Sequence, residues 1–148
     1  MLADNVACMA RSIQITFDAA DPHELARWWV SLLGYQLVDS HERVARLLAD
    51  GLVEETDVVR INGRLFLADF VAATDPDNAG PRLFFQRVPE PKTAKNRLHL
   101  DVSVDADQLD AEVQRLCAAG ATLTGYNEYP GHRAALLRDP EGNEFDLH

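Results

Sequence analysis

Two stretches of this sequence share one strand pattern, and this repeat constrains the fold more than any other feature. They are residues 13–18 and 98–103. In both, apolar and polar side chains alternate, so an extended strand would bury one face and leave a polar face open. A helical pattern follows each stretch and closes on a glycine, 20 positions after Gln14 and 21 positions after His99. The sequence therefore predicts two similar modules whose polar strand faces line a shared cleft.

An amphipathic helix is predicted after each strand. The first begins at Asp21-Pro22, an N-cap followed by a proline at the first helical position. His23 and His41 are expected at exposed helix ends. Apolar residues recur three and four positions apart, and we expect them to pack the helices onto the outer sheet faces. They are Leu25, Trp28, Trp29 and Leu32 in the first helix and Leu109, Val113 and Leu116 in the second.

The chain of 148 residues is the length of one structural domain. The first module is about 25 residues longer than the second, which predicts a helical insertion within it. We expect an N-terminal tail over 1–11, the first module over 12–89 with its insertion near 41–57, a connector over 90–97 and the second module over 98–148.

The composition argues against several partners. The formal net charge is −10, and such an acidic surface repels nucleic acid and anionic membranes. No apolar run is long enough to span a bilayer, and the first ten residues lack the features of a signal peptide. We therefore expect a cytoplasmic protein with a small-molecule partner.

Several catalytic motifs are absent from the sequence. It has no nucleophile elbow, phosphate-binding loop, CxxC pair or HExxH motif. These absences argue against serine hydrolases, nucleotide phosphatases, zinc ribbons and zincins.

Three segments resemble one protein superfamily. Residues 84–92, 95–101 and 138–145, the last including Asp139-Pro140-Glu141-Gly142, are similar to the glyoxalase-like and bleomycin-resistance-like subgroup of the vicinal oxygen chelate (VOC) superfamily. The superfamily includes glyoxalase I, extradiol dioxygenases, fosfomycin-resistance enzymes and bleomycin-binding proteins. The resemblance implies an α+β fold, in which two βαβββ modules form paired curved sheets around a cleft and the helices lie outside.

The resemblance also implies a position for a metal site. Metal-using members take one ligand from the first strand and one from the last strand of each module, which here gives Gln14, Gln86, His99 and Asp146. One imidazole, one carboxylate and two amides form a weak ligand set for zinc, although oxygen donors suit harder cations. We expect either no metal or a labile divalent ion such as Mn, Ni, Fe or Zn.

Other residues are candidates for binding an organic ligand. Phe84 shares a strand face with Gln86 and is suited to stacking on a flat ligand. Asp101 shares the face of His99 and can hold or charge its imidazole, so a hydrogen-bonded histidine is the alternative to a metal ligand. The remaining candidates are Thr16 on the first polar strand face, Arg97 in a basic connector with Lys92 and Lys95, and Tyr126 beside a loop that could cover the cleft.

Two functions from different classes remain open. The first is binding of a small organic molecule, such as an antibiotic or a metabolite, in the cleft. The alternative is a divalent-metal-dependent lyase or isomerase acting on a substrate with vicinal oxygens, with Asp146 as the catalytic base and His99 as ligand or acid. The sequence also leaves open whether the modules pair within one chain or between the two chains of a homodimer.

Overall fold

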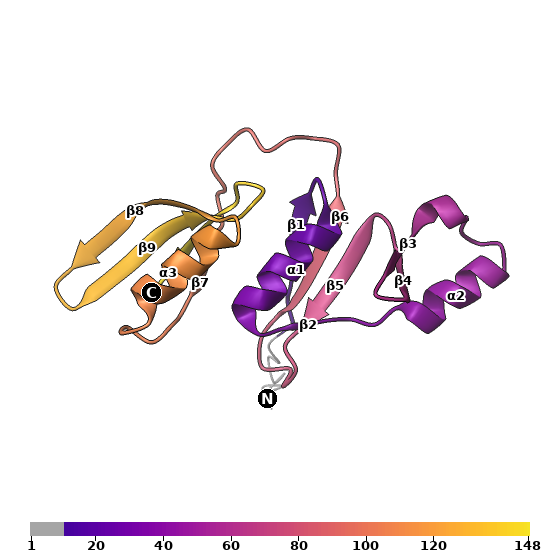
Figure 1. The fold of residues 1–148 in the computed structure, drawn as a ribbon, viewed down its shortest axis with the longest axis horizontal. Helices are drawn as coiled ribbons and strands as arrows, with labels where there is room; N and C mark the ends of the chain where they lie inside the picture. Colours follow the sequence, from indigo (N-terminus) through magenta and orange to yellow (C-terminus); the bar gives the residue numbers. More distant parts are fainter. Residues whose placement is uncertain (1–10) are drawn as a thin grey trace, which may run out of the picture.

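The chain folds into two four-stranded sheets with packed helices and an insertion at one end (Figure 1). The structure is a computed structural model that describes residues 11–148, so the expected tail over 1–11 lies outside it except for Arg11. The α+β fold with two similar modules is confirmed. Within the described residues, no helix has both the length and the apolar character needed to cross a membrane.

The first module contains a mixed sheet covered by one helix. Its strand order is β1-β6-β5-β2, and β1 runs parallel to β6. The Asp21 carboxylate caps α1, accepting hydrogen bonds from the backbone N–H groups of His23 and Glu24 at 3.1 Å. The elements are β1 (Gln14–Ala19), α1 (Pro22–Leu33), β2 (Gln36–Leu37), β5 (Phe70–Thr74) and β6 (Arg82–Arg87).

The second module repeats this arrangement without an insertion. Its strand order is β7-β10-β9-β8, so β7 corresponds to β1 and β10 corresponds to β6. The first strand begins at Leu100, and His99 immediately precedes it. The elements are β7 (Leu100–Val102), α3 (Leu109–Ala118), β8 (Thr122–Tyr129), β9 (His132–Arg138) and β10 (Glu144–Leu147).

The insertion in the first module extends beyond the expected placement near 41–57. It contains α2 (His41–Ala49), the short 3₁₀ helix η1 (Glu55–Asp57), β3 (Val58–Ile61) and β4 (Arg64–Leu67). The β3–β4 hairpin forms its own two-stranded sheet and therefore belongs to the insertion, which extends beyond the expected 41–57.

One histidine ties the insertion to α1, and a second ties α2 to β4 within the insertion. The ring Nε2 of His23 lies 2.9 Å from the carbonyl oxygen of Leu67, and the His23 ring is buried. The ring Nδ1 of His41 accepts a hydrogen bond from the backbone N–H of Leu65 at 3.1 Å. Both lie at helix starts as expected, but the expectation that they are exposed is wrong, because His23 is buried, His41 is half-buried and each bonds to the backbone of β4.

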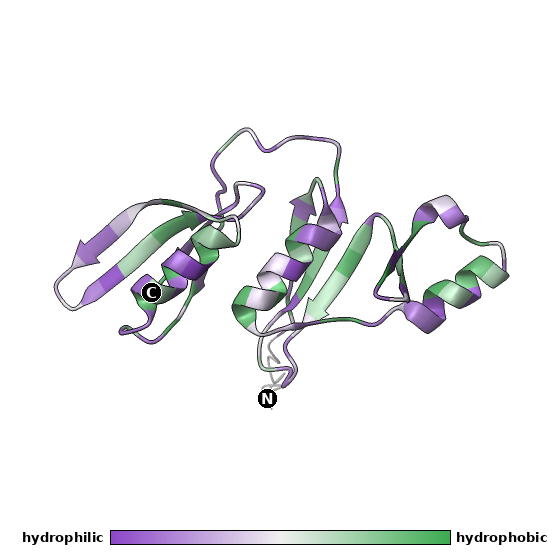
Figure 2. Ribbon diagram, viewed as in Figure 1, coloured by the Kyte–Doolittle hydropathy of each residue, from purple (hydrophilic) through white to green (hydrophobic). Residues whose placement is uncertain are grey.

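A shared core joins the modules. Trp29 of α1 is 1% exposed, and its ring centroid lies 5.1 Å from that of Phe17 in β1 and 5.2 Å from that of Phe145 in β10. Trp28 is half-buried and also contacts Phe145. Figure 2 shows the alternation of apolar and polar residues along α1 that this packing requires. The helix therefore contacts its own sheet and the second module together.

We predict that Trp29→Ala destabilises the domain by about 3–5 kcal/mol, because it leaves a large cavity between the modules. The free energy of unfolding from urea denaturation measures this change. Arg27→Ala on the exposed side of the same helix is the control, since its ion pair with Glu24 is a surface pair. Equal midpoints for Trp29→Ala and wild type would contradict the packing role.

Candidate functional site

Three side chains with metal-ligating atoms converge on the open face of the second sheet. The parallel register of β7 and β10 places Asp146 beside Asp101, and His99 lies on the same face two residues before Asp101. One ligand atom from each residue lies within 4.8 Å of the others. The Nδ1 atom of His99 is 2.9 Å from Oδ1 of Asp101, so the expected contact between this pair is present. The cluster combines one imidazole with two carboxylates.

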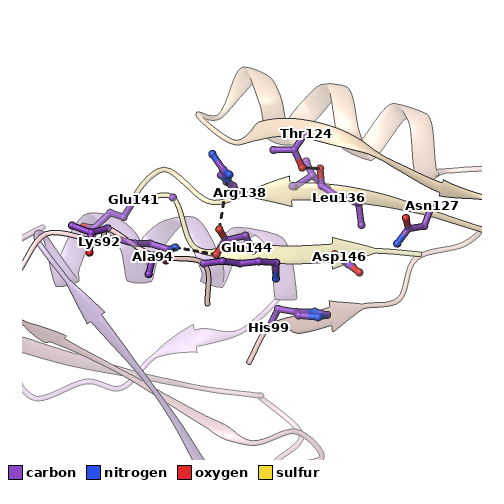
Figure 3. Close-up of a pocket in the computed structure, with 14 residues that line it drawn as sticks. Lys92, Ala94, His99, Thr124, Asn127, Leu136, Arg138, Glu141, Glu144 and Asp146 are labelled. Atoms are coloured by element: carbon purple, nitrogen blue, oxygen red, sulfur yellow. Dashed lines mark hydrogen bonds and ion pairs between the residues drawn. The ribbon is translucent and has the colours of Figure 1, made fainter. Parts of the chain in front are cut away.

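A pocket of about 540 Å³ opens beside this cluster (Figure 3). Figure 3 shows His99 and Asp146 at one side of the pocket and Lys92, Arg138 and Glu144 toward the other. The polar lining residues are Lys92, Thr93, Lys95, His99, Thr124, Asn127, Arg138, Glu141, Glu144 and Asp146. The pocket is therefore a polar site that has both basic and acidic groups.

Glu144 fixes the connector that forms one wall of the pocket. Its Oε2 atom accepts a hydrogen bond from the backbone N–H of Asn96 at 3.0 Å and lies 3.0 Å from Nζ of Lys92. The hydrogen bond from Asn96 is the main cause that lowers the pKa of Glu144 to about 2, and Lys92 adds to the effect. The carboxylate is thus held ionised between the connector and β10.

Gln14 and Gln86 do not join His99 and Asp146 in this pocket. Both lie on the first sheet, at opposite ends of the β1–β6 pair, and neither lines the pocket. Gln86 donates a hydrogen bond to Asp18 at 2.8 Å, and Gln14 accepts one from Arg82. Within one chain, the pocket brings together only two of the four residues proposed as metal ligands.

The strand registers also revise which residues of the two modules correspond. Gln86 pairs with Asp18 in the first sheet, as Asp146 pairs with Asp101 in the second. His99 lies two residues before Asp101, so its counterpart in the first module lies two residues before Asp18. That residue is Thr16 and not Gln14. The expected alignment of the first strands of the two modules was therefore shifted by two positions. A shift of two leaves every side chain on the same face of its strand.

The other candidate ligand-binding residues are dispersed. Phe84 lines a separate groove on the first module. Tyr126 lies on β8 under the Arg133 guanidinium, which is 4.2 Å from the ring centroid. The loop beside Tyr126 is the Pro130-Gly131 turn, which closes the β8–β9 hairpin and does not line the pocket. Arg97 is exposed and does not line the pocket.

The turn between β9 and β10 connects the modules. Asp139 is 2% exposed, and its carboxylate accepts hydrogen bonds from the indole N–H of Trp29 at 3.0 Å and from the backbone N–H groups of Glu141 and Asn143 at 2.9 Å. The Glu141 carboxylate accepts from the backbone N–H of Ala20 and Asp21 at 2.7 and 2.8 Å. This turn therefore holds the α1 N-terminus against the pocket wall.

Comparison with known proteins identifies the family. The glyoxalase-like domain family matches residues 14–148. The chain belongs to this family, and with it to the VOC superfamily. No curated protein sequence significantly matches this one.

Solved structures with this glyoxalase-like fold include two fosfomycin-resistance proteins. FosX from Mesorhizobium loti is 15% identical, with a TM-score of 0.61 and coverage of 95% of this chain and 91% of that chain. FosX from Listeria monocytogenes, in complex with Mn(II) and 1S,2S-dihydroxypropylphosphonic acid, is 12% identical, with a TM-score of 0.63 and coverage of 95% and 92%. A glyoxalase/bleomycin resistance/dioxygenase family enzyme from Burkholderia phytofirmans is 18% identical, with a TM-score of 0.60 and coverage of 90% and 94%. At these low sequence identities, the structural similarity shows that this chain shares the fold of these proteins.

Arg138 and Glu144 are among the pocket residues of this glyoxalase-like domain that were not candidates from the sequence. A signal for Glu144 was present, because it lies two positions before Asp146 and a strand places both on one face. No comparable signal existed for Arg138, since the register of β9 against β10 decides which of its residues reach the pocket.

We predict that Glu144 contributes an acid-sensitive part of the stability. Its folded-state pKa is lowered, so the stabilisation is complete above the ordinary pKa of glutamate and is lost as pH falls toward about 2. Urea denaturation between about pH 5 and about pH 2.5 should show a smaller loss of unfolding free energy in Glu144→Gln than in wild type. Glu90→Gln, in the exposed connector, should behave like wild type. Identical pH slopes for all three proteins would refute the assignment.

Proposed function

We propose that this glyoxalase-like domain binds a small organic anion in the pocket beside His99. The pocket volume of about 540 Å³ carries the proposal, because it falls within the range of small-molecule sites. Lys92, Lys95 and Arg138 line it, and Lys95 has no ion-pair partner within residues 11–148. Glu144 pairs with Lys92 and Arg138, and Glu141 and Asp146 also line the pocket, so the unpaired Lys95 is the group that favours an anionic ligand.

The His99 cluster fits a labile divalent cation. In the first module the amide of Gln86 donates to the carboxylate of Asp18, whereas in the second module two carboxylates occupy the equivalent positions. Two carboxylates with atoms within 4.8 Å of each other repel, and a cation bound at Asp146 would relieve this repulsion. Carboxylates with one imidazole suit Mn(II) better than a tight zinc site.

Each residue of the cluster has a proposed role at this cation. When the Nδ1–H group of His99 donates a hydrogen bond to Asp101, the Nε2 atom is the ring nitrogen that would bind the cation. His99 and Asp146 would then be ligands, and Asp101 would orient the imidazole. A ligand phosphonate or carboxylate would complete the coordination from the pocket.

A metal-dependent lyase or isomerase is the second candidate, and the His99 cluster is the observation that favours it. When bound, a divalent cation supplies Lewis acidity toward one of two vicinal substrate oxygens. Asp146, half-buried at the pocket wall, is then the candidate base, and His99 the candidate ligand or acid.

We predict that His99→Ala weakens Mn(II) binding at least about tenfold, because it removes the nitrogen ligand. Titration calorimetry on protein purified without a chelating tag measures the affinity. His132→Ala removes an exposed histidine outside the pocket and should leave the affinity unchanged. Equal affinities for wild type and His99→Ala would place the cation elsewhere.

The organic ligand can be tested with fosfomycin, because the FosX neighbours are fosfomycin-resistance proteins. We predict that Lys95→Gln weakens its binding in calorimetry more than Arg97→Gln does, since only Lys95 lines the pocket. Phosphorus NMR distinguishes the two candidate functions when fosfomycin is incubated with protein and Mn(II) and the metal is removed before the spectrum is recorded. An unchanged fosfomycin signal supports binding alone, and a new phosphonate resonance supports the enzyme. No binding with or without Mn(II) would exclude this phosphonate as the ligand.

We further propose that two chains pair so that the first-module face of one covers the second-module pocket of the other. Within one chain the polar face bearing Gln14, Thr16 and Gln86 lies away from the pocket. Large apolar side chains beside both faces are exposed, with Leu98 at 88% and Ile13 at 70%. Two-fold pairing would create two equivalent composite sites.

We predict that light scattering coupled to size-exclusion chromatography gives the mass of a dimer. Leu98→Glu should shift the protein toward monomer, because it places a charge at the contact. Leu52→Glu, on the distant insertion, is the control, since Leu52 is also exposed at 70%. A monomeric wild type at all concentrations would contradict the composite site.

A further inference from the structure

A second pocket of this chain is built by the insertion. A groove of about 80 Å³ lies between the insertion and the open face of the first sheet. The insertion contributes Arg43, Val44 and Phe66, and the sheet contributes Phe70, Arg82 and Phe84. This groove shares no lining residue with the His99 pocket. The second module has no equivalent, because a short turn joins β8 directly to β9.

Aromatic side chains form the apolar part of this groove. The ring centroids of Phe70 and Phe84 lie 5.4 Å apart, with the rings tilted by 35°. Phe66 is buried behind them, and Phe70 remains 38% exposed at the groove. Its volume is about half of the ~150 Å³ cavity that holds benzene in an engineered protein. Because the groove is open to solvent, it suits part of a single ring and not a fused ring system.

Two guanidinium groups supply the charge. Arg43 and Arg82 line the groove, and neither forms an ion pair with a carboxylate of the described residues. Arg82 instead donates to the neutral amide of Gln14, and its guanidinium carbon lies 5.6 Å from the centroid of the Phe84 ring. Two arginines beside exposed aromatic rings favour a ligand that has both a flat apolar part and a negative charge.

We propose that this groove is a binding subsite for a single-ring aromatic carboxylate. The ring would lie against Phe70 and Phe84, and the carboxylate would accept hydrogen bonds from Arg43 and Arg82. Within one chain the groove and the His99 pocket have separate linings, and the benzoate test needs no metal. Arg82 and Phe84 share a strand face with Gln86, so in the proposed dimer the groove would lie beside the partner's pocket.

The test uses benzoate as the probe and ¹H–¹⁵N NMR on the metal-free full chain at physiological ionic strength. We expect saturable shift changes centred on residues 38–44, 66–72 and 82–84. Benzyl alcohol, which keeps the ring but lacks the charge, should bind at least about fivefold more weakly, since charged hydrogen bonds contribute more than neutral ones. Shift changes centred on the His99 pocket, or equal binding of benzyl alcohol, would overturn the proposal.

Matched variants locate the charge and the ring contact. Arg43→Gln should weaken benzoate at least about fivefold, whereas Arg46→Gln on the same helix, outside the groove, should bind like wild type. Phe70→Ala should also weaken binding, and its partial exposure makes the folded state tolerant of the change. His99→Ala should retain wild-type benzoate affinity. Equal benzoate affinities for Arg43→Gln and Arg46→Gln would mean that any loss of affinity comes from general surface charge, and this result would refute the subsite.

Discussion

The buried carboxylate of Asp139 is the interaction on which the relation between the two modules depends. It is placed almost out of contact with water, which raises its pKa, and its four hydrogen-bond donors favour the ionised form in partial compensation. All four donors are N–H groups, from Trp29, Glu141 and Asn143. Asparagine could not replace it without turning an NH₂ group toward another N–H, so the site requires an acceptor-only side chain.

This carboxylate links the core to the functional surface. Through Trp29 it fixes α1 against Phe145, and through the Asp139–Gly142 turn it positions Glu141 at the α1 N-terminus. The turn also forms part of the pocket wall. The Asp139–Gly142 motif, which carried part of the resemblance to the superfamily, therefore has a structural role in this chain.

The sequence was sufficient for the elements that depend on local periodicity. The helical stripe through Leu25 and Trp29 and the alternation at Gln14–Ala19 are both present, because burial of one face requires those spacings. The sequence was not sufficient for contacts set by long-range docking. His23 and His41 carry no local signal that their partners are the backbone groups of Leu67 and Leu65.

The error in the candidate site has a similarly definite cause. Alternation tells which face a strand residue occupies but not how far along the strand it lies, because a shift of two positions preserves the alternation. Thr16 and Gln14 were therefore equivalent in the sequence, and only the β1–β6 pairing distinguishes them. His99 and Asp146 lie close together because the β7–β10 register brings Asp146 and Asp101 side by side.

The two modules thus use one scaffold for different chemistry. At equivalent positions, the first has a neutral amide bonded to a carboxylate and the second has two carboxylates with an imidazole. In the first module the carboxylate of Asp18 accepts a hydrogen bond from the amide of Gln86. In the second module the two carboxylates carry negative charge that a cation or a cationic group of a ligand can neutralise. The insertion adds Arg43 and Phe66 to a groove that only the first module has. The second module thus carries an acidic cluster, and the first carries a groove with arginines and aromatic rings. If two chains pair as proposed, a ligand that spans both sites would need a negative group toward the arginines and an oxygen donor toward the His99 cluster.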